Sequence, residues 1–304
     1  MPQTYIVDND YHNSRFDKWF KKKVKNLPQS LVEKLIRSNK IKINKKKTKS
    51  SYRVQRGDVV LVYDISKFKI LTRSKTIKYK PTKKEKEGYE NYIIEDNENF
   101  LVVNKPAGIA VQSGTKSFKN IIDILKDSKF FYDKKPYIVH RLDKETSGIL
   151  IIAKNREYAQ LFTSLFRIRK IHKTYLALTH NKIPNFKKIL KDDLIYFEKN
   201  KKIKQKAVTH LKVIKSNDYY SYAELNPITG RKHQIRRQLY NIGYPIVGDT
   251  KYFLDFKKFK IAKKTNYLML HAHKIKFMIN NVQYNFKAKY PEYFEEFLNK
   301  KIKL

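Results

Sequence analysis

The spacing of hydrophobic residues changes along the chain and predicts different elements in its two parts. Residues 14–24 have apolar positions at helical spacing, and a second predicted helix opens at Pro28 or Ser30. The stretch KIKIN at residues 40–44 alternates as a strand does, and Gly57-Asp58 predicts a turn before another strand. The first part therefore reads as two short helices followed by a small sheet.

Strand-like runs dominate the second part. They include NFLVVN, GILIIAKN, KTYLAL, AVTHLKVI and YLMLHAHKIKF, and helical spacing appears in REYAQLFTSLF and HQIRRQLYNI. This mixture predicts an α+β fold, built on a mixed, mainly antiparallel β-sheet with flanking helices. Residues 65–90 are rich in charge and poor in apolar periodicity, so we expect a basic linker there. The predicted domains are residues 13–64 and residues 91–304.

The charge of the chain favours a polyanionic partner. There are 68 Lys and Arg residues against 28 Asp and Glu, which gives a formal net charge of +40. Lysine-rich codon bias accounts for part of this excess, but such a surface would bind nucleic acid whatever its origin. No apolar run is long enough to cross a bilayer, and the absence of cysteine excludes disulfides and Cys-ligated zinc. We expect a cytoplasmic protein without a membrane partner.

One carboxylate stands out within VHRLDKETSGIL. Asp143 lies in a predicted loop between two buried strands, flanked by the cations Arg141 and Lys144. An isolated aspartate in this position is a turn residue, a helix cap, an ion-pair member or a nucleophile. Two other stretches supply chemical partners: ITGRKHQIRRQL predicts a turn and then a helix that begins at Arg231, and IHKTYLAL places Tyr175 in a strand.

These stretches together resemble the RluA-type pseudouridine synthases. HRLDKETSG, K-x-Y, PITGRKHQIR and GYPIVGD occur in the order of that family's motifs, from about residue 100 to residue 290. GIAVQSGTKSFKNIID is most similar to the RluC branch, which acts on large-subunit ribosomal RNA. Residues 13–64 resemble the S4 RNA-binding domain, through Arg15 and Asp17, the basic second helix and the final G-D-x-V. The glycine that usually precedes the S4 strand is replaced here.

The resemblance implies a role for particular residues. Asp143 corresponds to the catalytic aspartate, Tyr175 to the tyrosine that stacks on the target base, and Arg236 to the arginine that pairs with the aspartate. Arg141 matches the arginine that helps to expel the target nucleotide from its helix. The further RNA-binding residues that we expect are Arg15, Lys34, Arg37, Ser38, Lys40 and Arg231.

The physical chemistry of pseudouridine formation agrees with this assignment. Cleavage of an N-glycosidic bond develops positive charge on the sugar, so one anionic group near C1′ or C2′ suits the transition state. Ordinary glycoside hydrolysis, by contrast, needs a pair of carboxylates and a water. Arg236 would keep Asp143 ionised and oriented, and Tyr175 offers a flat face to the flipped-out base. The Tyr175 hydroxyl would be a reluctant base unless its pKa were perturbed.

Other candidate sites have simpler interpretations. His140, beside Ile138 and Val139, is expected to be structural. His271 and His273 alternate on one strand face, but without a third clustered ligand we predict no metal. The GTKS sequence at residues 114–117 lacks the spacing of a nucleotide-triphosphate loop. The reaction is redox-neutral, and we expect no cofactor.

The sequence leaves two other functions open. A non-catalytic S4-type RNA-binding or ribosome-assembly protein would explain the charge, although it would have no need of a carboxylate that faces phosphates. A related synthase that acts on tRNA or on another rRNA site would carry the same catalytic residues. The leading hypothesis is the isomerisation of uridines in 23S rRNA, on free RNA or on the assembling large subunit, by a monomer.

Overall fold

The computed structural model describes residues 2–64, 79, 81–113, 119–184, 187–198, 201–253 and 265–303. The chain forms two compact units, residues 1–77 and residues 78–304. GTKS at residues 114–117, and most of the expected linker, lie outside the described residues. Within the described part, no helix is long and apolar enough to cross a membrane.

The first unit combines two helices with small antiparallel sheets. β6 is central in a sheet of order β1-β6-β3-β4, and β2 pairs with β5. The apolar face predicted for the first helix is buried, because Phe16, Trp19 and Phe20 are each at most 1% exposed. The elements are β1 (Gln3–Ile6), β2 (Ser14–Arg15), α1 (Phe16–Lys23), α2 (Gln29–Arg37), β3 (Ile41–Ile43), β4 (Lys46–Lys47), β5 (Arg53–Val54) and β6 (Val59–Val62), with a 3-10 turn at Asn9–Tyr11.

The two compact units differ in extent from the expected domains. The first unit includes β1, which lies before residue 13, since Gln3–Ile6 pairs with Val59–Val62. The expected linker ends earlier than residue 90, because α3 (Lys83–Gly88) belongs to the second unit. Thr82 and Glu85 form a reciprocal cap at the start of α3, and Tyr89 packs against the core that contains α4. A short capped helix has too few residues to show a clear hydrophobic period.

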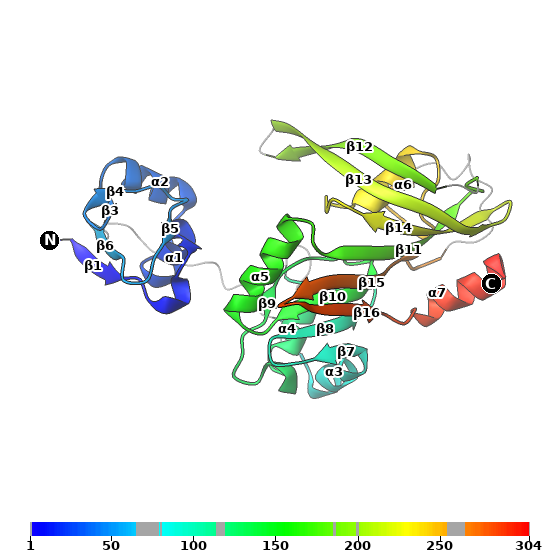
Figure 1. Ribbon diagram of the computed structural model, residues 1–304, viewed down its shortest axis with the longest axis horizontal. Helices are drawn as coiled ribbons and strands as arrows, with labels where there is room; N and C mark the ends of the chain where they lie inside the picture. The colour runs from blue at the N-terminus through cyan, green and yellow to red at the C-terminus, as the bar shows by residue number, and fades with distance from the viewer. Residues whose placement is uncertain are drawn as a thin grey trace. The chain divides into compact units, whose positions relative to one another are not determined.

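The second unit is built on one large, mainly antiparallel sheet, as predicted. Its strands follow the order β12-β13-β14-β11-β15-β10-β8-β7, with β16 on β15 and β9 on β10 (Figure 1). The strands are β7 (Ile93–Asp96), β8 (Phe100–Lys105), β9 (Tyr137–Ile138), β10 (Ser147–Ala153), β11 (His172–His180), β12 (Lys187–Glu198), β13 (Lys201–Ser216), β14 (Tyr220–Pro227), β15 (Leu270–Ile279) and β16 (Val282–Lys287).

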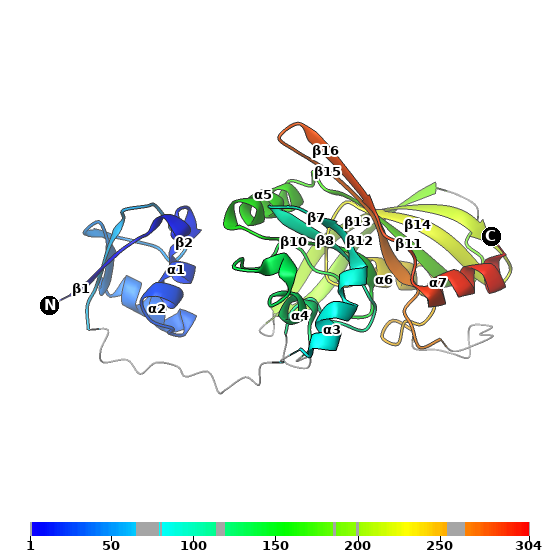
Figure 2. The same ribbon diagram turned by 90° about the horizontal axis from the view of Figure 1, so that it is seen from below.

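Helices cover the sheet at different places along the strand order. α5 packs on β9 and β10, whereas α6 packs on β12, in the other half of the sheet (Figures 1 and 2). The helical elements are α4 (Ile121–Leu125), α5 (Arg156–Arg167), α6 (Gln234–Asn241), α7 (Glu292–Phe297), 3-10 turns at Glu90–Tyr92 and Lys129–Phe131, and a π-helical turn at Leu298–Ile302.

The two halves of the sheet meet where β10 pairs with β15. Ser147 lies opposite His271 and Gly148 opposite Ala272, and this pairing is parallel, unlike the other pairings of named strands in the described chain. Gly148 has a φ of +109°, and a Cβ there would lie 2.2 Å from the carbonyl oxygen of Ala272. The close approach of the two backbones therefore requires glycine at this position.

Candidate active site

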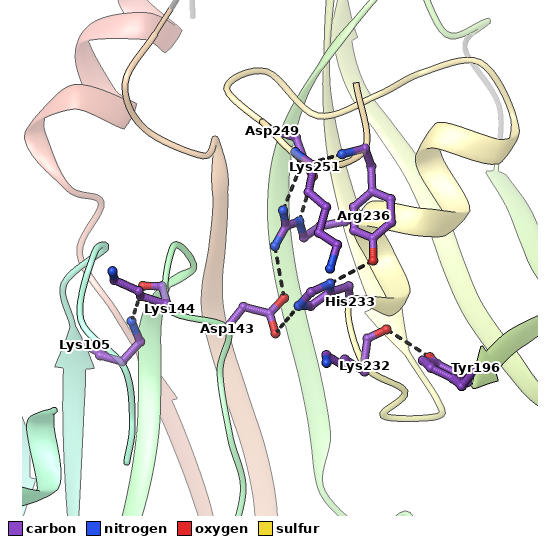
Figure 3. Close-up of polar contacts among 10 residues, drawn as sticks. Lys105, Asp143, Lys144, Tyr196, Lys232, His233, Arg236, Asp249 and Lys251 are labelled. Carbon is purple, nitrogen blue, oxygen red and sulfur yellow. Dashed lines mark hydrogen bonds and ion pairs between the residues drawn. The ribbon is translucent and has the colours of Figure 1, made fainter. Parts of the chain in front are cut away.

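Asp143 is held in a loop that leads directly into the most deeply buried strand. The loop joins β9 to β10, and all seven residues of β10 are buried. Lys105, at the end of β8, is itself fully buried, and its ammonium donates to the carbonyls of Pro106 and Ile109 at 2.9 Å and of Lys144 at 3.2 Å. Figure 3 shows Lys105 behind the loop, on the side away from the residues that Asp143 faces.

Lys105 is a supporting residue of the site that no pattern in the sequence singles out. Burial lowers the pKa of Lys105 to about 7, although the nearby Glu145 and Asp143 oppose this shift. Three carbonyl acceptors satisfy the donors of the ammonium, and one of them comes from the residue next to Asp143. A lysine within the apolar run NFLVVNK was the available signal, but the sequence does not reveal which loop it holds.

The carboxylate of Asp143 faces two groups from the loop and helix after β14. Its Oδ2 lies 3.7 Å from Nη1 of Arg236, and its Oδ1 lies 3.6 Å from Nε2 of His233 (Figure 3). Both distances exceed the range of a good hydrogen bond. The side chain of Asp143 is 26% exposed. The carboxylate is therefore oriented by charge while its oxygens stay accessible to another molecule.

Arg236 reaches Asp143, as predicted, but it is bound more tightly by Asp249. Its Nε and Nη2 each donate to a different oxygen of Asp249 at 2.7 Å, and both side chains are almost fully buried. Burial disfavours the charge of Arg236, but the hydrogen bonds and field of Asp249 outweigh it, so the pKa of Arg236 is raised. Asp249 also accepts hydrogen bonds from the backbone N–H groups of Lys251 and Tyr252.

The helix that carries Arg236 starts later than predicted. α6 begins at Gln234, and Arg231 lies in the turn before it. His233 is the residue that caps the helix and has a left-handed φ of +53°, while the side chain of Gln234 accepts from the backbone N–H of Arg231. This side-chain bond closes the turn in place of a helical bond. The sequence pattern could not reveal the left-handed residue that separates turn from helix.

His233 is a second residue whose position near Asp143 was not foreseen. Its Nδ1 forms a 2.8 Å hydrogen bond with the hydroxyl of Tyr252, and its Nε2 faces Asp143 (Figure 3). Burial lowers the pKa of His233, against the opposing field of Asp143. A neutral imidazole that accepts from Tyr252 carries its proton on the nitrogen that faces the carboxylate. Its signal was the motif KHQIR, in which it precedes the helix.

Tyr175 lies on β11, opposite Leu225 of β14 and Ala272 of β15, and lines the same cleft as Asp143. Burial, with a smaller contribution from Asp143, raises the pKa of Tyr175 well above its ordinary value. The hydroxyl therefore keeps its proton in the unliganded protein, which strengthens the expectation of a reluctant base. The ring remains available as an apolar face.

The cleft around these residues has a volume of about 830 Å³ and is strongly cationic. Asp143 is the one carboxylate among the described residues that line it. Arg231 donates from its side chain to the carbonyl of Lys206, and Arg141 is exposed. The basic residues in the lining are Arg141, Arg167, Arg169, Lys173, Arg231 and Arg236.

His140 has the structural role predicted for it. Its Nε2 accepts a 2.8 Å hydrogen bond from the backbone N–H of Ile151, and its ring packs on Phe166. Burial lowers the pKa of His140 to about 3. His271 and His273 are both buried on β15, and the described residues contain no cluster of three metal-ligating side chains.

The expected RNA-binding residues of the first unit differ in their surroundings. Lys34 and Arg37 are exposed on the last turn of α2, and Ser38 follows as its cap. Arg15 is paired with Asp17 at 2.7 Å, and Lys40 with Asp64 at 2.8 Å. To bind Arg15 or Lys40, an RNA phosphate would have to share the cation with its carboxylate partner or displace that partner. Lys34 and Arg37 can bind a phosphate without such an exchange.

Comparisons with known proteins identify both parts of the chain. Residues 99–241 match the family model for RNA pseudouridylate synthase, and residues 14–60 match the S4 domain. Two curated relatives are named ribosomal large subunit pseudouridine synthase C. The protein from Buchnera aphidicola subsp. Baizongia pistaciae is 34% identical, with 90% of this chain and 88% of the relative covered. The protein from Rickettsia bellii is also 34% identical, with coverage of 95% and 98%.

A solved structure agrees with this result. Human RNA pseudouridylate synthase domain containing 4 superimposes with a TM-score of 0.60 at 26% identity, over 70% of this chain and 94% of the human chain. The predicted resemblance is thus confirmed over both units. The chain belongs to the RNA pseudouridylate synthase family and carries an S4 domain before its catalytic domain.

Proposed function

We propose that this enzyme converts specific uridines of 23S ribosomal RNA to pseudouridine and that Asp143 acts on the sugar of the flipped-out nucleotide. The observation that carries this proposal is the geometry of one carboxylate. Asp143 stands in a cationic cleft, with Arg236 and His233 at 3.7 and 3.6 Å, and hydrogen bonds to neither. Its lone pairs are free for the substrate, while the charge of Arg236 balances that of the carboxylate.

The reaction breaks the bond between C1′ and N1 and joins C1′ to C5 of the same uracil. N1 gains a proton, and C5 loses one. Asp143 would meet the positive charge that develops on the sugar, as a nucleophile or as a base toward C2′. Tyr175 would hold the detached ring by stacking, worth about 1–3 kcal/mol. Because the uracil is both leaving group and nucleophile, exclusion of water separates isomerisation from hydrolysis. No cofactor enters this scheme.

Positive charge would deliver the RNA to the cleft. Arg141 and Arg231 line the cleft, where they can contact phosphates beside the flipped base. On the S4 unit, Lys34 and Arg37 offer exposed cations on α2, with Ser38 and Lys40 shortly after that helix and Arg15 directly before α1. We propose that the enzyme works as a cytoplasmic monomer on free rRNA or on the assembling large subunit. The names of the curated relatives support rRNA as the substrate.

The decisive experiment uses Asp143→Asn. Unmodified 23S rRNA carrying tritium at C5 of uridine should release tritium with wild-type protein, and the release with Asp143→Asn should fall at least a thousandfold. Asp127→Asn is a matched control, since Asp127 is exposed in a turn outside the cleft. Equal release by wild type and Asp143→Asn would refute the role of Asp143.

The choice of RNA needs a separate measurement. Pseudouridines in rRNA and tRNA can be mapped by carbodiimide labelling in cells that carry wild type or Asp143→Asn. We expect the missing modifications to lie in 23S rRNA. If the missing pseudouridines lie in tRNA instead, the enzyme is a tRNA pseudouridine synthase. Full rescue of a growth defect by Asp143→Asn, with no modification lost, would favour a non-catalytic role in ribosome assembly.

A further inference from the structure

Lys173 lies beside Tyr175 in the cleft, two residues earlier on β11. Both side chains line the cleft. The pairing of β11 with β15 shifts register between Thr174 and Tyr175. The residue that this shift skips is His273 of β15, so β11 itself stays regular here. Residues i and i+2 of a strand project to the same face, about 6.6 Å apart along the strand. A ligand that stacks on Tyr175 therefore has Lys173 within reach along the strand.

The ammonium group of Lys173 is half-buried without an anionic partner. No carboxylate of the described residues lies within ion-pair distance of it, although many other lysines of the chain have one. A nearby ring is that of His140, whose low pKa reflects burial first and the charge of Lys173 second. Burial also lowers the pKa of Lys173. A partly desolvated charge without a counterion is unfavourable for the folded protein.

The surroundings indicate what kind of group completes this site. The cleft carboxylate, Asp143, faces Arg236 and His233. On the wall formed by the end of α5, Arg167 and Arg169 are exposed and line the same cleft. A ligand that fits here carries negative charge at one end, near Lys173, and a flat ring at the other, on Tyr175. A nucleotide has this layout, since its ribose separates its phosphate from its base.

We propose that Lys173 binds a phosphate that flanks the target uridine and thereby fixes the distance between that phosphate and the base on Tyr175. The inference rests on the proposed function, because it takes the occupant of the cleft to be RNA. Lys173 is then a positioning residue for the flipped nucleotide. Its charge weakens the unliganded fold and is neutralised when the substrate binds. Arg167 and Arg169 would contact phosphates farther along the strand.

The test compares Lys173→Met, Lys173→Arg and Lys170→Met in the full-length enzyme. Lys170 is exposed and does not line the cleft, so it controls for the loss of one positive charge. With C5-tritiated 23S rRNA, Lys173→Met should raise KM about tenfold and leave kcat within about threefold, because the phosphate is bound in ground and transition states alike. Lys173→Arg should stay near wild type.

Two further measurements separate phosphate binding from a structural role. The slope of log affinity against log salt should fall by about 0.7–0.9 in Lys173→Met, the contribution of one phosphate contact. The unfolding midpoint of Lys173→Met should equal or exceed that of wild type, because an unpaired buried charge is removed.

Three results would overturn the proposal. They are a KM equal to that of Lys170→Met, a fall in kcat with an unchanged salt slope, and a loss of activity that follows a lower unfolding midpoint. Wild-type protein that releases no tritium would instead refute the proposed function, and this role of Lys173 with it.

Discussion

At the scale of the residue, the site depends on a chain of charges rather than on one pair. Asp249 binds Arg236 through two short hydrogen bonds, and Arg236 in turn faces Asp143 at a longer distance. The inner pair fixes the position of the guanidinium, because two parallel bonds to a carboxylate leave Arg236 little rotational freedom. The outer contact is looser and can adjust when substrate enters.

Asp249→Asn should therefore lower kcat with little change in KM. The neutral asparagine amide has one oxygen, so it cannot accept both hydrogen bonds from Arg236. One charge-assisted hydrogen bond is worth about 1.5–3 kcal/mol, so we expect kcat to fall by about tenfold to a hundredfold. Tritium release from C5-labelled 23S rRNA measures it.

The control for this variant is Asp218→Asn. Asp218 pairs with Lys182 at the surface, where its side chain is 84% exposed, so its loss should not affect the rate. A kcat for Asp249→Asn equal to that of the control would show that Arg236 holds its position without Asp249.

The sequence revealed the residues that we propose to touch substrate better than those that support them. Asp143, Tyr175 and Arg236 stand in motifs, and the structure brings them to one cleft. Asp249 and Lys105 were missed as supporting residues, although Asp249 lies in the family motif GYPIVGD. Their importance comes from hydrogen bonds to distant parts of the chain, between Asp249 and Arg236 and between Lys105 and Lys144. No local pattern encodes such a distance.

At the scale of the element, the junction between β10 and β15 places the loop of Asp143. The strands and their antiparallel order were largely predictable from period-two patterns and buried apolar runs. The parallel pairing was not, because it joins segments more than a hundred residues apart in the chain. The start of α6 was placed too early, since nothing in RKHQ distinguishes a left-handed His233 from a helical one.

Gly148→Ala should destabilise the catalytic unit by about 2–4 kcal/mol. The added Cβ would overlap the backbone of Ala272, which cannot move without breaking the strand pairing, and the positive φ adds strain. Urea denaturation followed by far-ultraviolet circular dichroism measures the change.

Gly88→Ala provides the comparison for this variant. Gly88 ends α3, has no positive φ, and has nothing within 4 Å of an added Cβ, so alanine there should be neutral or mildly stabilising. Equal effects of the two substitutions would mean that the sheet can open at Gly148 without cost.

At the scale of the whole molecule, the proposed RNA-binding residues of the S4 domain and the proposed catalytic residues lie on different units. The first carries exposed cations on α2, whereas the second holds Asp143 and its partners within one cleft. The catalytic unit also has its own buried cores and its own continuous sheet. We therefore expect changes in the first unit to affect KM and changes around Asp143 to affect kcat.

Removal of residues 1–77 should raise KM and relax the choice of uridine, while kcat at saturating RNA stays within a few fold. The salt dependence of RNA affinity should also become weaker, because phosphate contacts are lost. Filter binding and tritium release at several salt concentrations test this. Equal affinity of the full-length and shortened proteins would contradict it.

Mild acid should destabilise the catalytic unit through a buried histidine. His271 is fully buried, bonded to Ser147 at 2.9 Å, and burial lowers its pKa to about 3. The pKa of histidine in the unfolded chain is ~6.5. At a pH between that value and the folded pKa, the unfolded chain binds a proton that the native state does not bind, so stability falls as the pH falls. At pH 5 this one group costs about 2 kcal/mol.

His271→Gln keeps a polar partner for Ser147 but does not titrate. Its free energy of unfolding should change less between pH 7 and pH 5 than that of wild type, by about 2 kcal/mol, even if the variant is weaker at pH 7. Urea titrations at the two pH values provide the comparison. Parallel curves for both proteins would show that His271 is protonated in the native state as well.

The parallel contact of Gly148 with Ala272 also determines when the enzyme first exists during its own synthesis. A ribosome that adds about 5–20 residues per second needs about 6–25 seconds to travel from the first of these positions to the second. Throughout that interval the loop of Asp143 lacks the neighbouring strand that supports it. A nascent chain therefore cannot complete the support of the Asp143 loop until β15 has been synthesised and has paired with β10.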